Sequence, residues 1–374
     1  MWATVKTVAA YLDQLAPRHL ALPGDPVGLQ LGDPRREVRT LLVALELDQA
    51  TLAEAAARKA ELVVTHHPLL FQPLQALDES TPHGALVARA VRHEISVFSA
   101  HTNLDIAPRG LNHRLADLLG LMEQGRSVME TTGQDRLLKL VVFVPAGHED
   151  SVRQALAEAG AGWIGAYSHC TFQVPGTGTF MPREGTDPYI GQQGRLEKVD
   201  EFRLETILPA SLREAVLQAL FAVHPYEEVA YDLYPLEREG TPYGLGLIGN
   251  LERPLTLEQI LKLCREKLQL STLRYWAPPR EEYSRIAVCS GSGGSLVERA
   301  ALLGAELYIS GDFRYHDFKK AEAAGLCLVD AGHYGTERPV VELLGQYLRR
   351  CFKRDGYQTS VVEAGVSSAG WNYA

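Results

Sequence analysis

Histidines stand in four short segments, each at the end of an apolar run, and three of these segments also contain carboxylate residues. The segments are THHPLLF (65–71), AHTNLD (100–105), GDFRYHD (311–317) and DAGHYGTE (330–337). Imidazole and carboxylate groups together form a ligand set that suits Zn²⁺, Fe²⁺ or Mn²⁺. The ends of strands in open α/β sheets are also the places where ligands bind. The sequence therefore predicts a metal site assembled from these segments.

The adjacent pair His66 and His67 follows a short apolar run and precedes Pro68. Neighbouring side chains in a strand point to opposite faces, so both can serve one site only where the strand breaks. Pro68 marks such a break, because the residue before a proline has a restricted backbone. We expect the two imidazoles to contact two different ions that lie side by side.

Two further histidines have a carboxylate residue four positions later. His101 precedes Asp105, and His333 precedes Glu337. If the local chain is helical, this spacing places both members of a pair on one face. One carboxylate can bridge two ions that lie about 3.5–4 Å apart. We expect Glu337 to be that bridge.

Three other features have more than one interpretation. His316 could orient a metal ligand, contact a substrate, or be an ordinary surface histidine. The segment SGSGGS (290–295) is typical of a tight turn that needs glycine, although backbone amides at such a turn also favour anions. The histidine and acidic residues of HPYEEVAYDLYPL (224–236) could bind a metal, but we favour a loop and strand in an oligomer contact.

Short apolar runs alternate with helical patterns in both terminal parts of the chain, which predicts a layered α/β fold. The pattern is interrupted in the middle and then resumes. In the first part the expected strands are 39–45, 61–64 and 95–99, and the expected helices are 4–15, 49–59 and 84–93. In the last part the expected strands are 285–289, 306–310 and 327–329, and the expected helices are 255–268, 296–303 and 337–353.

The middle of the chain contains an internal repeat. Pro145-Ala146 matches Pro209-Ala210, and Val152 matches Val216, at one constant offset of 64 residues. Two strand–helix–strand units of this kind predict a ferredoxin-like layer, in which each half covers the other's apolar face. We expect an α/β core built from residues 1–126 and 241–374, with residues 127–240 as an inserted ferredoxin-like α+β domain.

The composition excludes several classes of protein. The 374 residues include 37 Lys and Arg against 46 Asp and Glu, so the net charge is −9. Nucleic-acid binding through phosphates and polybasic membrane docking are disfavoured by this balance. No apolar run approaches the about 20 residues of a spanning helix. The five cysteines lie far apart with no CxxC pair, so we expect neither a disulfide framework nor a thiolate zinc site. Free thiols of this kind favour a cytoplasmic location.

At these motifs the chain resembles the Nif-three-like family of dinuclear-metal-centre proteins, many of which are named type-two GTP cyclohydrolase I homologues. The matching segments occur in the family's order over nearly the whole chain, and they include DPVGLQLG (25–32). The insertion resembles the CutA- or PII-like insertion of longer bacterial members. Two departures concern Gly24-Asp25-Pro26, where members often have Trp-Asp-Asn, and Glu46, where an Asp is usual.

The resemblance implies two divalent metal ions per chain, which could be zinc, iron or manganese, in a toroidal hexamer. A histidine at the position of His101 lies close to the metals in the family, so His101 is an extra ligand or a proton carrier. The resemblance implies five metal ligands, of which the last is the bridge: His66, His67, Asp105, His333 and Glu337.

Two functions of different classes follow. The first is a metal-dependent hydrolase that acts on a small nucleotide or phosphoester, with His101 or His316 moving the proton. The alternative is a non-catalytic metal-dependent sensor, metallochaperone or adaptor that uses the inserted domain, which rests on analogy of fold. In either case we expect a homo-oligomer that binds a small molecule and neither a membrane nor nucleic acid.

Overall fold

The computed structural model describes residues 1–365 and separates the chain into two units. The first unit contains Met1–Thr132 and the described residues from Tyr243 onward, so segments from the first and last parts of the sequence build it. The second unit is Gly133–Pro242. Two long strands belong in part to each unit, β7 (Ser127–Pro145) and β10 (Tyr231–Leu255).

The first sheet of the first unit has five strands, four of which are parallel. β2 pairs antiparallel with β6 at one edge, and the last described strand, β15, forms the other edge beside β4. The order across the sheet is β15 (Ser360–Glu363), β4 (Thr40–Ala44), β5 (Leu62–Thr65), β6 (Ser96–Ser99) and β2 (Gly28–Leu31). A separate small pair joins β1 (Ala3–Thr4) to β3 (Glu37–Val38).

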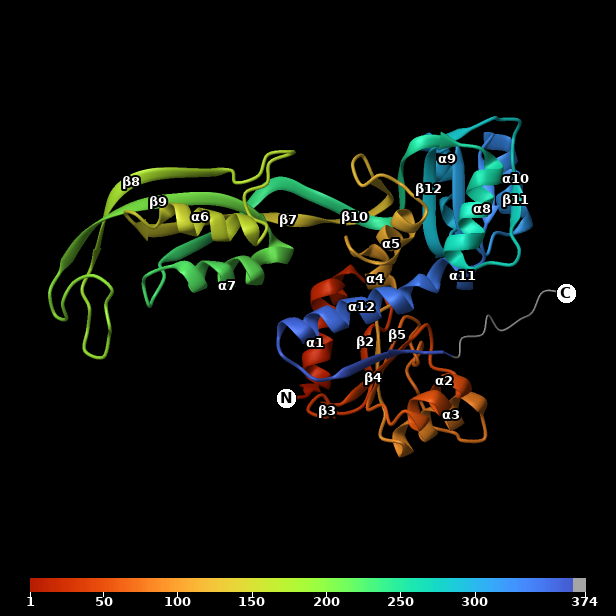
Figure 1. Cartoon of the computed structure of the whole chain (residues 1–374), viewed down its shortest axis with the longest axis horizontal. Coiled ribbons are helices and arrows are strands. Elements are labelled where there is room, and N and C mark those ends of the chain that lie inside the picture. Colours follow the sequence, from red (N-terminus) through yellow and green to blue (C-terminus); the bar gives the residue numbers. More distant parts are fainter. Residues whose placement is uncertain (366–374) are drawn as a thin grey trace. The chain divides into compact units, whose positions relative to one another are not determined.

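Helices cover both faces of this sheet, because side chains alternate along each strand. Leu41 and Val43 pack in one apolar cluster with α1 and α12, whereas Leu42 packs in another with α2 and α3. Figure 1 shows α1 and α12, from opposite ends of the chain, side by side on the first face. The helices are α1 (Val5–Leu15), α2 (Gln49–Ala57), α3 (Pro82–Arg92) and α12 (Pro339–Arg354), and two shorter ones follow β6, α4 (Thr102–Ile106) and α5 (Leu111–Leu118).

The second sheet of the first unit contains three parallel strands between two antiparallel ones. Within this unit the order is β11 (Arg274–Trp276), β14 (Cys327–Asp330), β13 (Leu307–Gly311), β12 (Tyr283–Ser292) and the last part of β10. Its helices are α8 (Leu257–Leu268), α9 (Val297–Leu302), α10 (Tyr315–Ala324) and the short α11 (His333–Glu337).

The sequence predicts the start of α8 well and the start of α12 less well. Thr256 caps α8 by accepting from the amide of Gln259, whose side chain caps Thr256 in return. The expected helix 337–353 instead begins at Pro339, after α11 has ended at Glu337. Proline has no N–H to donate to a preceding turn, so it favours the first turn of a new helix.

The second unit repeats one strand–helix–strand arrangement. β7 leads to α6 (Glu149–Glu158) and β8 (Thr171–Phe180), and β9 (Glu197–Pro209) leads to α7 (Arg213–Val223) and β10. β9 pairs antiparallel with both β7 and β8, and the order is β10, β7, β9, β8. The prolines of the sequence repeat, Pro145 and Pro209, end β7 and β9. Helices α6 and α7 share one apolar cluster with the sheet.

Across residues 1–365, none of the helices has the length and apolar character needed to cross a membrane.

The contrast between two leucines tests where the free energy of unfolding of the first unit originates. Leu344 of α12 is fully buried in the cluster shared with α1, whereas Leu302 at the end of α9 is 76 % exposed. We expect Leu344→Ala to lower the free energy of unfolding by about 2–5 kcal/mol, because it leaves a cavity. The same change at Leu302 should cost less than about 0.5 kcal/mol. Urea unfolding of both variants makes the measurement, and equal losses would contradict this packing.

Candidate metal centre

The histidine segments follow parallel strands, and the two sheets of the first unit bring them together. His66 and His67 follow β5, and His101 comes shortly after β6. In the second sheet Asp312 follows β13 and His333 comes after β14. The ring centre of His67 lies 5.8 Å from that of His101 and 5.7 Å from that of His333. The cluster therefore forms between the carboxyl ends of strands from both sheets.

The chain breaks its strand pattern at His66 and His67. The amides of both residues donate to the same acceptor, the carbonyl oxygen of Leu45, at 3.0 and 2.9 Å. A regular strand alternates its amides between two sides, so this shared acceptor marks the end of the ladder. The two imidazole centres lie 5.4 Å apart as a result. Adjacent residues can thus face one site.

Glu337 lies at the centre of the cluster and is 4 % exposed. Its Oε2 lies 2.9 Å from Nε2 of His67 and 3.0 Å from Nε2 of His333. Its Oε1 lies 3.7 Å from Nε2 of His66. Burial raises the pKa of this carboxyl, but the hydrogen bonds with His333 and His67 and the nearby imidazole of His66 outweigh burial and hold the pKa well below its ordinary value.

The two histidines that contact Oε2 of Glu337 have raised pKa values. The hydrogen bond to Glu337 is the main reason that the pKa of His333 is raised, to about 9. Burial lowers the pKa of His67, but hydrogen bonds with Glu337 and Glu46 raise it to about 10. The carboxylate therefore favours positive charge at the imidazoles beside Oε2, which is the electrostatic property a cation site needs.

Helix α11 positions His333 and Glu337 on one face, four residues apart. The other ring nitrogen of His333, Nδ1, donates to Oδ2 of Asp312 at 2.8 Å. Asp312 has a φ of +56°, which is uncommon for a residue with a side chain. The turn after β13 thus holds the aspartate in the place where it orients His333.

A second aspartate orients His101, just before α4. Nδ1 of His101 donates to Oδ1 of Asp25 at 2.8 Å, and the amide of Thr102 donates to Oδ2 of Asp25 at 3.0 Å. Burial raises the pKa of Asp25, but its hydrogen bonds with His101 and Thr102 give a net lowering. The aspartate is therefore a fixed acceptor that leaves the other ring nitrogen of His101 free to face the cluster.

Asp105, on α4, is 9 % exposed and lies close to His66. Its Oδ2 lies 3.8 Å from Nε2 of His66, and its Oδ1 accepts from the hydroxyl of Ser290 at 2.7 Å. The amide of Ser290 donates to the side chain of Asn112 at 2.8 Å. Burial is the main cause of a raised pKa at Asp105. One oxygen is thus held by β12, and the other points to His66.

The structure assembles two groups of side chains whose donor atoms lie within 4.8 Å of one another, as a metal ion requires. One group is His66, His67 and His101, and the other is His67, His333 and Glu337. Asp105 belongs to neither group by this distance. His316 does not join the cluster: it lies exposed on the first turn of α10, where its ring contacts Tyr315.

The sequence motifs alone indicate no role in the site for Asp25, Asp312 and Ser290. Asp25 is 76 residues from His101, and Ser290 is 185 residues from Asp105. Nothing in local spacing indicates such contacts. Asp312 has a weak local signal, since it follows an apolar strand in the motif GDFRYHD.

Comparison with known proteins identifies the family. The family model described as Duf34/NIF3 (NGG1p interacting factor 3) matches residues 3–368. The chain belongs to the NIF3 family.

The relatives of this NIF3 protein extend along its full length. A Halalkalibacterium halodurans protein named GTP cyclohydrolase 1 type 2 homolog is 40% identical over 364 residues, which is 97% of each chain. A crystal structure of a Bacillus cereus protein related to NIF3 has a TM-score of 0.83 and 36% identity, with 100% of both chains covered. A Staphylococcus aureus structure has a TM-score of 0.70 at 27% identity and covers 100% of this chain and 99% of its own.

The chemistry of the cluster fits a divalent metal. Nε2 of His66 is buried and has no hydrogen-bond partner within residues 1–365, so a lone pair is available there. Acceptors hold Nδ1 of His66, His101 and His333, which is the usual way in which a protein orients metal-binding imidazoles. The acceptor for His66 is the carbonyl oxygen of Ala100 at 2.8 Å. Nitrogen and carboxylate donors suit zinc, iron and manganese.

The glycine-rich turn of β12 lies directly against this cluster. Gly291 has a φ of +64°, and a Cβ there would lie 2.4 Å from Oε1 of Glu337. The tight turn predicted for this segment therefore needs glycine at position 291 because of its contact with Glu337. Only glycine lets the backbone approach the buried carboxylate.

Gly291→Ala tests this close approach. Gly325 is a matched control, since its φ is +65° and no atom lies within 4 Å of the position of its Cβ. Both alanine variants incur the cost of a left-handed backbone, about 1 kcal/mol. We expect only Gly291→Ala to displace Glu337 and lower the metal content of the purified protein. Inductively coupled plasma mass spectrometry measures this content. An equal metal content in both variants would contradict the contact.

Proposed function

We propose that this NIF3 protein is a dinuclear metal-dependent hydrolase of a small nucleotide or phosphoester. The observation that carries the proposal is the position of Glu337, whose two carboxylate oxygens face different imidazoles. A carboxylate with this arrangement is suited to bridging two cations. The names of the relatives, GTP cyclohydrolase 1 type 2 homolog, support a nucleotide as the class of substrate.

In this proposal the two sides of Glu337 hold one ion each. His67 and His333 would act with Oε2 of Glu337 on one side. His66 and Asp105 would act with Oε1 on the other, where the distances from Nε2 of His66 to the two carboxylates are 3.7 and 3.8 Å. The ligand set would then be His66, His67, Asp105, His333 and Glu337.

Two bound ions would lower the pKa of a bound water and would stabilise negative charge on the oxygens of the substrate. His101 is placed to move a proton, because Asp25 holds its Nδ1 and its ring lies 5.2 Å from that of His66. An imidazole fixed in this way keeps one tautomer and one orientation, as a general base requires. His101 as a further ligand is the other role that its position supports.

We also propose that the inserted unit has a ferredoxin-like fold and that its boundaries are close to residues 127 and 240. Its strand order β10, β7, β9, β8 and its two helices on a shared apolar cluster support this assignment. The family resemblance further leads us to propose a toroidal hexamer of identical chains. Light scattering of the purified protein tests the hexamer, and a monomeric mass would contradict it.

The second candidate function is a metal-dependent sensor or adaptor without turnover. The observation that favours it is the separate second unit, Gly133–Pro242, which has its own apolar core. In this case the metal centre would be retained, while the purified protein would hydrolyse none of the substrates tested.

Two histidines provide a matched test of metal loading. His67 lies inside the cluster, and His316 is exposed on α10. We expect the wild type and His316→Ala to purify with about two divalent ions per chain. His67→Ala should lose at least one of them, because it removes a nitrogen donor next to Glu337. Unchanged metal content in His67→Ala would contradict the ligand assignment.

Turnover is tested with a panel of nucleotides and phosphoesters and the native metal. We expect Asp105→Asn to lower kcat/KM by at least about 100-fold while the protein remains folded, because the amide is a poorer ligand than the carboxylate. Glu342→Gln, on the exposed face of α12, is the control and should keep full activity. Absence of turnover by the metal-loaded wild type on the whole panel would favour the sensor.

A further inference from the structure

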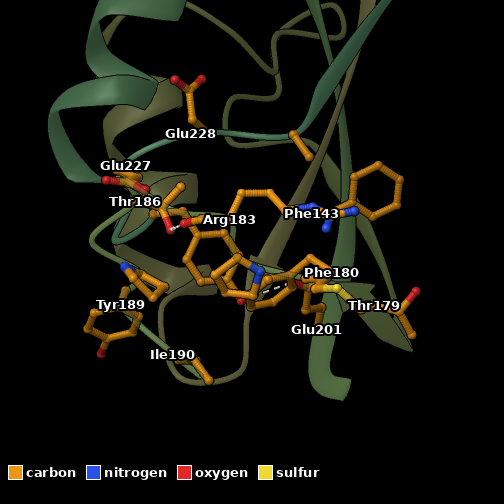
Figure 2. A pocket seen from close by; sticks show the side chains of 16 residues that line it. Phe143, Thr179, Phe180, Arg183, Thr186, Tyr189, Ile190, Glu201, Glu227 and Glu228 are labelled. Atoms are coloured by element: carbon orange, nitrogen blue, oxygen red, sulfur yellow. Dashed lines mark hydrogen bonds between the residues drawn. The ribbon is translucent and has the colours of Figure 1, made fainter. Parts of the chain in front are cut away.

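A cavity of about 460 Å³ lies in the second unit, and all the residues that line it fall within Gly133–Pro242. Figure 2 shows its side chains, which come from β7, β8 and β9, from the loop after β8, and from the segment before β10. Four aromatic rings contribute to its walls. They belong to Phe143, Phe180, Tyr189 and Tyr226.

A buried carboxylate is the chief polar group of this cavity. Glu201, on β9, is 9 % exposed, and its Oε1 accepts from the hydroxyl of Tyr226 at 2.9 Å. Its Oε2 lies against Gly178, where a Cβ would be only 2.0 Å away. The carboxylate is therefore confined between β8 and Tyr226. The ion pairs found within residues 1–365 include none to Glu201.

A buried carboxylate without a cationic partner is costly to keep in an apolar wall. Arg183 is the only basic residue that lines the cavity. Figure 2 shows its side chain extending toward Phe143. Two more carboxylates, Glu227 and Glu228, lie exposed at the cavity. Glu227 accepts from the amide of Asp187 at 3.2 Å, so it helps to hold the loop after β8. The excess of negative charge favours a cation.

The aromatic rings add a second attraction for a cation. The ring centre of Tyr226 lies 5.9 Å from that of Phe180 and 6.3 Å from that of Tyr189. Rings at these separations form adjacent walls, and the faces of aromatic rings attract organic cations. An inorganic cation would prefer several oxygen donors, and the candidate metal groups within residues 1–365 do not include these residues.

We propose that this cavity binds a small organic cation that carries N–H donors, of the amidinium or ammonium type. Its N–H groups would donate to Glu201, and its carbon skeleton would lie against Tyr226, Phe180 and Tyr189. This site is separate from the metal cluster in its residues, and it does not depend on the proposed hydrolase. It would give the inserted unit a ligand of its own.

Benzamidine is a suitable probe, with benzamide as its uncharged isostere, and calorimetric titration of the full chain measures both. We expect benzamidine to bind saturably and at least about tenfold more tightly than benzamide, because a charge-assisted hydrogen bond to Glu201 is lost in the neutral compound. Equal affinity for the two compounds, or no saturable binding of benzamidine, would overturn the proposal. This comparison needs no variant.

Matched variants locate the binding. Glu201→Gln keeps the shape and removes the charge, so benzamidine affinity should fall at least about tenfold. Glu214→Gln, on α7 and outside the cavity, should leave affinity unchanged. Unaltered affinity in Glu201→Gln would overturn the assignment. If that variant does not fold, Tyr189→Ala decides, with Phe172→Ala as its control outside the cavity, since both side chains are exposed. Only Tyr189→Ala should weaken binding.

Discussion

The structure of the site depends on one buried carboxylate, Glu337. An anion in the interior is tolerated only where positive or hydrogen-bonding groups surround it. Imidazoles from two parts of the chain, the pair His66 and His67 and the later His333, meet this requirement, with the shortest distances of 2.9 and 3.0 Å on one of the two oxygens. Because the two oxygens of this carboxylate face different imidazoles, we propose that it bridges two cations.

The two sheets of the first unit together supply the groups that surround this carboxylate. The first sheet supplies His66 and His67 at the end of β5, and the second supplies the segment that contains His333 and Glu337. Each half alone would present an incomplete donor set. The outer acceptors come from other segments, namely Asp25, before β2, for His101 and Asp312, after β13, for His333. The orientation of the imidazoles is therefore a property of the whole unit.

Local patterns could predict much of this molecule. The alternation of apolar runs with helical segments predicted the mixed α/β class, and the similarity to NIF3-related structures supports it. The four-residue spacing of His333 and Glu337 predicted a shared helix face, which α11 provides. Long-range contacts of the candidate ligands could not be predicted, because a contact such as that between Ser290 and Asp105 joins residues 185 apart in the sequence. The cavity around Glu201 was missed for the same reason, since its walls come from segments that only the folded sheet brings together.

The most direct test of the central claim is the number and separation of metal ions beside Glu337. Anomalous diffraction from crystals of protein purified without added metal measures both. We expect two peaks about 3.5–4 Å apart, one near His66 and one near His67 and His333, with the Glu337 carboxylate between them. A single peak away from Glu337, or no peak in protein that is otherwise folded, would contradict it.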